Sequence, residues 1–168
     1  MPGELHVDAS LFMGMHSKDP AVRAAATTFF AARLRQPVVM KLEEVGRCDD
    51  YIWQLPRDVQ DAYYPFMDVL QSLMPIRRRP YDADALAALA GLPAGPTAAL
   101  RHRDRLLLAS VVAARGELVT LNPRLIPLAG SGLPVRTPGP AAGRGVFPAE
   151  LDKLYEQSLA LEADHAEL

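Results

Sequence analysis

The sequence predicts a three-layer α/β/α domain with a central parallel sheet, and three observations lead to that class. Short apolar segments that suit strands alternate with longer segments that carry a helical apolar face. The chain has 168 residues, of which 49% are hydrophobic, so it can bury one core without disulfides. Strands separated by helices are typical of parallel sheets, which bind ligands at the carboxyl ends of their strands.

The overall charge and the single cysteine indicate which partners and which cellular compartment to expect. The net charge of −2 argues against a protein covered in basic surface, although a local basic strip can still bind phosphate. Cys48 has no partner for a disulfide, which favours a reducing compartment. We find no signal-peptide pattern and no apolar run of about 18 residues, so we expect a cytoplasmic protein without membrane contact.

The first half of the chain is predicted to form two strands and four helices. The strand candidates are short apolar segments at residues 5–9 and 37–40. The helix candidates span residues 10–16, 21–34, 41–53 and 57–74. Asp19 and Pro20 suit the start of the second helix, whereas Pro65 marks a kink or a boundary in the fourth. The third helix is expected to turn four side chains toward the core: Leu42, Val45, Ile52 and Trp53.

The second half is predicted to contain the most apolar helix. Residues 76–81, which include Arg77-Arg78-Arg79, suit a short strand or a loop, and residues 117–121 suit a strand. Helices are expected over residues 82–91, 96–115 and 149–165. The second of these carries apolar residues on every side of its C-terminal half, so that half should be buried all round. Gly and Pro are frequent in residues 129–146, which predicts a loop.

Polar residues stand at positions where a charge is costly unless it is paired. Asp8 follows the first strand and Asn122 follows the last one, so both side chains meet at one sheet edge if these strands are parallel neighbours. Asp104 opens the apolar half of the most apolar helix, where an unpaired charge is unfavourable. Glu43 and Glu44 follow the second strand, and helix geometry alone does not choose between them.

Carboxylates on separate elements suit a hard cation such as Mg²⁺ or Mn²⁺, which prefers oxygen ligands and can activate water at a phosphoryl group. Each acid also has a structural interpretation. Asp8 can cap a turn, and both glutamates can lie on a solvated helix face. Asp104 can pair with Arg101 or Arg105. A metal site and structural roles are therefore both open on the residues alone.

The arrangement of these residues resembles the PIN-domain nuclease family. The family pattern is an acid after the first strand, a Glu in the helix after the second, an Asp in a late helix, and Thr-x-Asp or Thr-x-Asn after the next strand. The chain offers Val7-Asp8-Ala9-Ser10, then Glu44-Val45, then the stretch from Asp104 to Asn122, which is the most specific match. Glu44 is preferred over Glu43 because the family register favours it.

The resemblance covers roughly residues 4–136, although residues 55–98 match poorly. It implies a PIN-like domain over residues 1–136. Residues 137–168 are then a Gly/Pro-rich loop and a final helix that pack on this domain or extend from it.

The resemblance implies a metal-dependent ribonuclease. Its catalytic residues would be Asp8, Glu44, Asp104 and Asn122, and the three acids would bind Mg²⁺ or Mn²⁺. RNA is the implied substrate, and small bacterial members are often toxins held by a small antitoxin protein. A homodimer is compatible with this interpretation.

Because Asn122 replaces a fourth acid, the alternative is a PIN-like protein with an altered site. Such a protein would serve as a binding or regulatory module, or in other metal-dependent chemistry on small molecules.

Other side chains have weaker functional interpretations. The basic cluster around Arg101 and the Arg77-Arg78-Arg79 triplet can hold RNA phosphates or simply keep the surface soluble. His6 and His16 flank Asp8, and a non-catalytic role is favoured for both. Cys48 lacks a histidine partner, which disfavours a nucleophilic role. Core positions are expected for Met13, Met15, Met40 and Trp53, and packing rather than base stacking is expected for Tyr63 and Tyr64.

Overall fold

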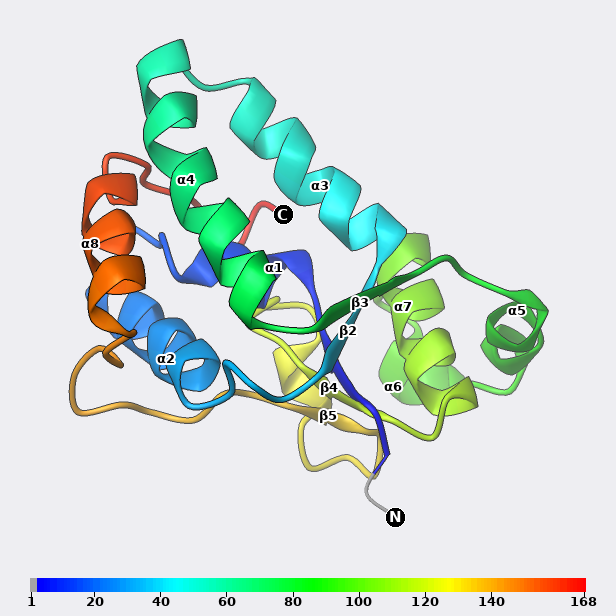
Figure 1. Ribbon diagram of the computed structural model, residues 1–168. Helices are drawn as coiled ribbons and strands as arrows, with labels where there is room; N and C mark the ends of the chain where they lie inside the picture. The colour runs from blue at the N-terminus through cyan, green and yellow to red at the C-terminus, as the bar shows by residue number, and fades with distance from the viewer. Residues whose placement is uncertain (1–2) are drawn as a thin grey trace.

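The computed structural model describes residues 3–168 as a parallel sheet with helices on both faces (Figure 1). The strands are β1 (Leu5–Val7), β2 (Val38–Lys41), β3 (Ile76–Arg79), β4 (Glu117–Val119) and β5 (Val135–Arg136). The helices are α1 (Ala9–Gly14), α2 (Pro20–Ala31), α3 (Leu42–Trp53), α4 (Arg57–Leu73), α5 (Ala83–Ala90), α6 (Ala94–Thr97), α7 (His102–Ala113) and α8 (Ala149–Ser158), with a 3-10 helix η1 (Ile126–Leu128). The predicted α/β class with a central parallel sheet is confirmed.

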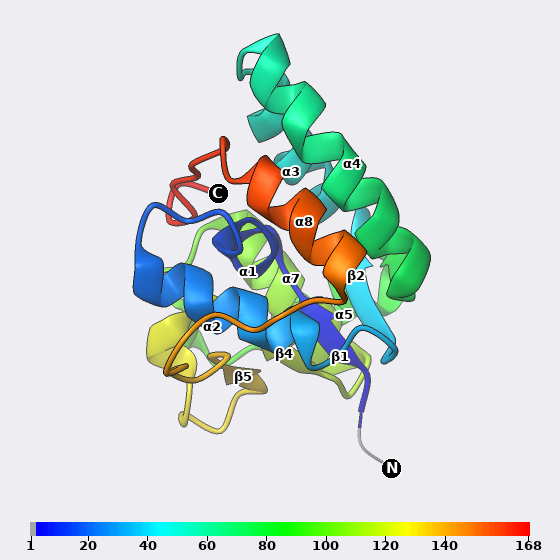
Figure 2. The ribbon, with the colours of Figure 1, turned by 60° about the vertical axis from the view of Figure 1, so that its left-hand side comes forward.

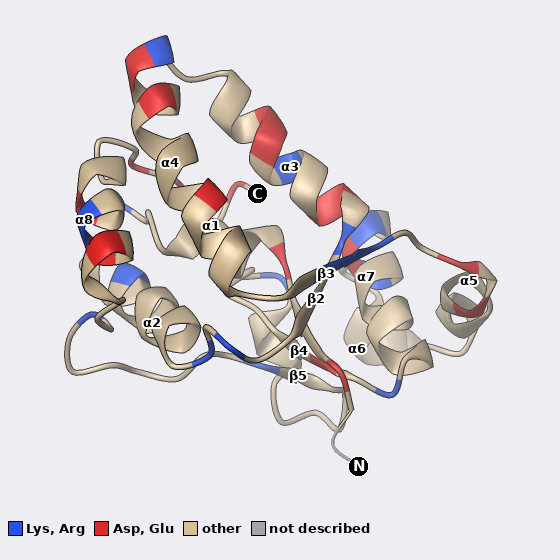
Figure 3. Cartoon of the chain, viewed as in Figure 1, with Lys and Arg blue, Asp and Glu red and all other residues tan. Residues whose placement is uncertain are grey.

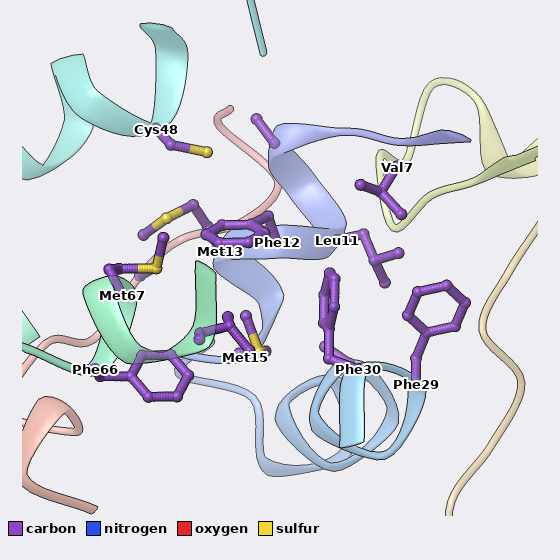
Figure 4. Packing of buried hydrophobic residues seen from close by; sticks show 14 of the residues in the cluster. Val7, Leu11, Phe12, Met13, Met15, Phe29, Phe30, Cys48, Phe66 and Met67 are labelled. Carbon is purple, nitrogen blue, oxygen red and sulfur yellow. The ribbon is translucent and has the colours of Figure 1, made fainter. Parts of the chain in front are cut away.

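The two faces of the sheet bury two separate cores because successive strand residues point to opposite sides. Val7 pairs with Val119, and both belong to the larger core, which α1, α2, α3, α4 and α8 cover. Leu118 points the other way, into a smaller core with residues of α7 and β5. Figure 4 shows Met13 of α1 in the larger core, with Cys48 on one side and Met67 on the other.

The strand order brings β1 and β4 together at the point where the chain changes direction across the sheet. The order is β3-β2-β1-β4-β5, so the chain moves outward from β1 to β3 and then returns to the other side of β1. Ligands bind α/β sheets at the carboxyl ends of the strands beside such a switch point. Val7 pairs with Val119, so the residues that follow them, Asp8 and Thr120, lie level with each other.

The most apolar helix is shorter than predicted. Residues 96–115 do not form one helix: α6 ends at Thr97, and α7 begins at His102 after an extended Arg101. The C-terminal half of α7 is also not buried all round, since Val112 and Ala113 are exposed. The apolar pattern could not show this, because the sheet and α5 cover only part of the helix surface.

Two of the α3 side chains that were predicted to face the core are exposed, one at each end of the helix. Trp53 is 71% exposed and Leu42 is 47% exposed, whereas Ile52 is buried. The hairpin of α3 and α4 extends away from the sheet in Figure 1, so the end of α3 that carries Trp53 has little sheet to pack against. Helix α4 runs through Pro65 without a boundary, and Pro65 lies on its exposed side, where water can bond a freed carbonyl.

Two further predicted boundaries were wrong. The segment 129–146 was expected to be a loop, but Val135 and Arg136 form β5 and pair with β4. The final helix was expected to reach residue 165, but α8 ends at Ser158. The chain leaves the helix there because Ala163 pairs with Ser17 in a parallel bridge. Such long-range pairing carries no local signal.

Residues 137–168 pack on the same core as the rest of the chain. Helix α8 lies against α4 (Figure 2), and its Leu151 and Tyr155 are buried. The Tyr155 hydroxyl donates a hydrogen bond to the Met15 carbonyl over 2.6 Å. Within residues 3–168, no helix combines the length and apolarity that a bilayer crossing requires.

His16 is enclosed where α8 meets the body of the protein. Its ring packs edge-on against Tyr63, Phe66 and Tyr155, and its Nε2 is 2.7 Å from the Ser158 hydroxyl. Burial, with a smaller effect of the Arg23 charge, lowers the pKa of His16 to about 3. The folded protein therefore holds this ring neutral through the range in which an exposed histidine becomes protonated.

We expect His16→Gln to weaken the acid dependence of stability. Between about pH 6.5 and 3 the unfolded chain binds a proton at His16 that the folded protein does not, so the free energy of unfolding falls as the pH is lowered. Removing the ring should reduce that slope by up to about 1.4 kcal/mol per pH unit. Urea unfolding at pH 7, 6, 5 and 4 measures it, with the exposed His102→Gln as control. Equal slopes in wild type and His16→Gln would contradict the prediction.

Candidate active site

Asp8 joins the end of β1 to the end of β4. The side chain is 1% exposed and caps α1, with Oδ1 accepting hydrogen bonds from Leu11 N over 3.0 Å and from Ser10 Oγ over 2.7 Å. Its other oxygen accepts from the Thr120 hydroxyl. Burial, followed by the charge of Glu44, raises the pKa of Asp8 to about 6, and the hydrogen bonds oppose this rise. Asp8 thus has the predicted capping role and also connects the ends of two neighbouring strands through a buried hydrogen bond.

Glu44 is the acid of α3 that points inward. Its Oε2 accepts from Ala9 N over 2.8 Å, and Arg47 Nη1 donates to both of its oxygens, over 2.9 and 3.0 Å. Glu44 is 2% exposed, whereas Glu43 is exposed. Acidic and basic residues follow one another along α3 in Figure 3. The solvated-face interpretation therefore holds for Glu43 and is wrong for Glu44.

Asp104 and Asn122 are in direct contact. Asn122 Nδ2 donates to Asp104 Oδ1 over 3.0 Å, and Arg124 Nε donates to Asp104 Oδ2 over 2.6 Å. The structural pairing anticipated for Asp104 therefore exists, but with Arg124 rather than with Arg101 or Arg105. Asn122 is also fixed at its oxygen, which accepts from Arg124 N over 3.0 Å.

Two hydroxyl groups connect the halves of the site. Thr120 Oγ1 donates to Asp8 and accepts from Asn122 N over 2.9 Å. Ser10 Oγ lies 3.2 Å from Thr120 Oγ1 and accepts from Leu121 N over 3.0 Å. The site is therefore one continuous network that runs from Asp8 across the switch point to Asn122.

Sequence reasoning did not single out four residues of this network. Ser10 and Thr120 belong to the quoted motifs, Ser10 standing two positions after Asp8 and Thr120 beginning Thr-x-Asn. Arg47 stands one helical turn after Glu44, a spacing that suits an ion pair. Arg124 could not be identified from the sequence, because its partner Asp104 lies 20 positions earlier on another element.

The carboxylate and amide oxygens of the site are suitable ligands for a divalent cation, but they are not arranged around a common point. Each carboxylate retains lone pairs beyond the hydrogen bonds described above. Asp8 has no cationic partner within residues 3–168, whereas Arg47 and Arg124 neutralise the other two acids. Over the same residues, no three His, Cys, Asp or Glu side chains are grouped so as to hold a metal together. An ion bound by all three acids would therefore require their side chains to approach one another.

The other candidate residues lie outside this network. Two arginines of the β3 triplet bond Glu4, and the third donates to Gln71. Burial, with the Glu44 charge second, raises the pKa of the Cys48 thiol well above its usual value, which disfavours a nucleophile. Tyr63 is buried, as packing rather than base stacking requires. His6 is buried against Gly116, and burial followed by the charge of Lys41 lowers its pKa to about 4.

Comparison with known proteins identifies the family but not an activity. A family model described as a family of unknown function (DUF6190) matches residues 1–168, so the chain belongs to that family. None of the curated proteins compared with the chain matches it.

We expect Arg124→Met to destabilise the metal-free protein by about 3–5 kcal/mol, because it leaves the Asp104 carboxylate buried without its cation. The control is Arg101→Met, which removes the same charge from an exposed position and should change stability by less than about 0.5 kcal/mol. Chemical denaturation at pH 7 measures both. Similarly small losses of stability in Arg124→Met and Arg101→Met would show that the buried Asp104 carboxylate is not stabilised by Arg124.

Proposed function

We propose that this DUF6190 protein is a metal-dependent ribonuclease of the PIN type. The observation that carries the proposal is the buried network at the carboxyl ends of β1 and β4 that connects Asp8 through Thr120 to Asn122 and Asp104. Glu44 bonds Ala9 N, next to Asp8, and all four site residues are at most 2% exposed. Buried acids from three elements at a topological switch point are expensive for stability alone. The same residues are the ones that match the family pattern.

Three carboxylates would hold the ion: Asp8, Glu44 and Asp104. Asn122 would contribute its amide oxygen once that oxygen is released from Arg124 N. A bound Mg²⁺ or Mn²⁺ would activate water and stabilise charge on a phosphoryl oxygen. Ser10 and Thr120 would keep Asp8 in position, and a pKa of about 6 leaves this carboxyl mostly ionised at neutral pH.

A binding module without hydrolysis is the second candidate. The observation that favours it is that Arg47 and Arg124 already neutralise Glu44 and Asp104, as in purely structural ion pairs. Under either function RNA is the proposed ligand. An antitoxin partner, a homodimer and a cytoplasmic location stay predictions from the sequence.

We expect Mn²⁺ or Mg²⁺ to support RNA cleavage, and Asp104→Asn to reduce the rate at least about a hundredfold, since removing a charged ligand weakens both ion binding and water activation. Asp58→Asn is the matched control, because it removes an exposed charge of α4 that does not line the site. Cleavage of labelled RNA at several metal concentrations provides the rates. Wild type that binds RNA but never cleaves it with either ion would favour the binding module. Full activity in Asp104→Asn would remove Asp104 from the site.

We expect Asn122→Asp to lower the melting temperature without metal and to tighten Mn²⁺ binding. The new carboxylate would face Asp104 Oδ1 at the position where the amide now donates over 3.0 Å, and the two charges would repel. An added charge also strengthens an oxygen-ligand site, so Mn²⁺ should restore stability by linkage.

Calorimetric titration with Mn²⁺ and thermal melts with and without the ion measure these changes. Gln157→Glu, which adds the same charge on exposed α8, is the control. An unchanged Mn²⁺ affinity in Asn122→Asp would show that position 122 does not reach the ion.

A further inference from the structure

Three arginines from different elements gather beside the acidic site. Arg47 comes from α3, Arg103 from α7, and Arg124 from the segment after β4. Burial, and after it the charge of Arg47, lowers the pKa of Arg103; Arg124 acts in the same direction, and Asp104 opposes it. A pocket of about 360 Å³ adjoins Arg47 and Arg103. Arg47 and Arg124 are paired with Glu44 and Asp104, whereas Arg103 forms no ion pair with an Asp or Glu side chain within residues 3–168. Arg103 is therefore the guanidinium group of the three that most needs an anion.

Some donors of these arginines have no protein partner. Arg47 Nη2 and Arg103 Nε are buried and donate to no acceptor within residues 3–168. The main-chain oxygen of Leu168 accepts from Arg103 Nη2 and from Arg124 Nη2, over 3.3 Å in each case. One oxygen held between two guanidinium groups takes the position that suits a phosphate oxygen.

The segment that supplies this oxygen is held by individual hydrogen bonds and by three buried residues, Leu161, Ala163 and Leu168, rather than by regular structure. Residues 159–168 follow α8 without regular structure and lie above α1 in Figure 2. Ala163 bonds the main chain of His16 and Lys18. The Tyr51 hydroxyl contacts Glu162 O and Asp164 N, over 3.4 and 3.3 Å, and His165 Nδ1 lies 3.0 Å from Ser17 Oγ. Glu167 and Leu168 then line the pocket. Within residues 164–168 only Leu168 is buried, so moving these five residues exposes one buried apolar side chain, and a segment without helix or strand opens at lower cost than a core helix.

We propose that Arg47, Arg103 and Arg124 form a phosphate-binding subsite beside the carboxylates, and that residues 164–168 cover it. RNA then binds by displacing this segment, so the segment restrains the protein's own site. The choice of RNA as ligand rests on the proposed function, but the inference does not require hydrolysis. The phosphodiester backbone would offer charged oxygens to these arginines, including Arg47 Nη2 and Arg103 Nε, which have no acceptor within residues 3–168.

The test is fluorescence anisotropy of a labelled ten-nucleotide oligouridylate, with metal removed by EDTA so that no cleavage occurs. The double variant Tyr51→Phe and His165→Ala weakens two anchors of the segment in the full chain. It should bind RNA about tenfold more tightly than wild type, the scale of two neutral hydrogen bonds. Arg103→Gln should bind about tenfold more weakly, and Arg57→Gln, an exposed arginine of α4, should match wild type.

Two controls test the phosphate subsite and its covering segment separately. An oligouridylate with uncharged methylphosphonate linkages should not bind, because phosphate charge is what the arginines recognise. Hydrogen exchange on wild type should become faster in residues 164–168 when RNA is added, and should stay slow at Ala163, whose N–H bonds His16 O. Equal binding of the uncharged oligomer would overturn the phosphate subsite, and unchanged exchange in that segment with RNA bound would overturn its displacement. Binding without any cleavage in the presence of Mn²⁺ would overturn only the nuclease proposal.

Discussion

The hydrogen bond from Thr120 to Asp8 is the contact on which the organisation of this protein depends. It joins the carboxyl ends of β1 and β4, the neighbouring strands between which the sheet order reverses. Asp8 also caps α1, whose six residues are all buried, so the same side chain orients the central helix of the larger core. A change at Asp8 would therefore affect strand pairing, helix capping and the acidic site together.

Charge balance is the second constraint on the site. Arg47 and Arg124 oppose two of the three buried acids, whereas Asp8 has no cationic partner within residues 3–168, and burial raises its pKa. This is the pattern expected when burial disfavours an anion and hydrogen bonds compensate only in part. A divalent cation would supply the missing positive charge and would release guanidinium groups toward phosphate. The acidic network and the arginine cluster are thus two halves of one electrostatic arrangement.

The final part of the chain links the cores to that arrangement. Helix α8 is held by Tyr155 and by the His16–Ser158 contact, and the segment after it returns to Arg103 and Arg124. The PIN-like pattern predicted from the sequence covers residues 4–136 and gives this segment no role. Its position beside the acids follows only from long-range packing.

Much of the fold and part of the site could be predicted from the sequence. Strands and helices could be predicted because the spacing of apolar residues along each element is a local property of the sequence. Asp8 and Asn122 could be placed at one sheet edge because parallel strands end on the same side. The α6–α7 break, the short β5 and the exposure of Trp53 could not be predicted, since each depends on what the sheet covers. The residues alone also could not choose between Glu43 and Glu44, which differ in the folded protein by burial and by the contacts of Glu44 with Ala9 and Arg47.

The sequence by itself determined which residue types were available for the site and on which elements they stand. Tertiary structure alone decided their partners: Arg124 for Asp104, Thr120 for Asp8, and Leu168 for Arg103. The physical reason is that hydrogen bonds and ion pairs form over a few ångströms in space, whereas these partners are separated by 20 to 112 positions along the chain.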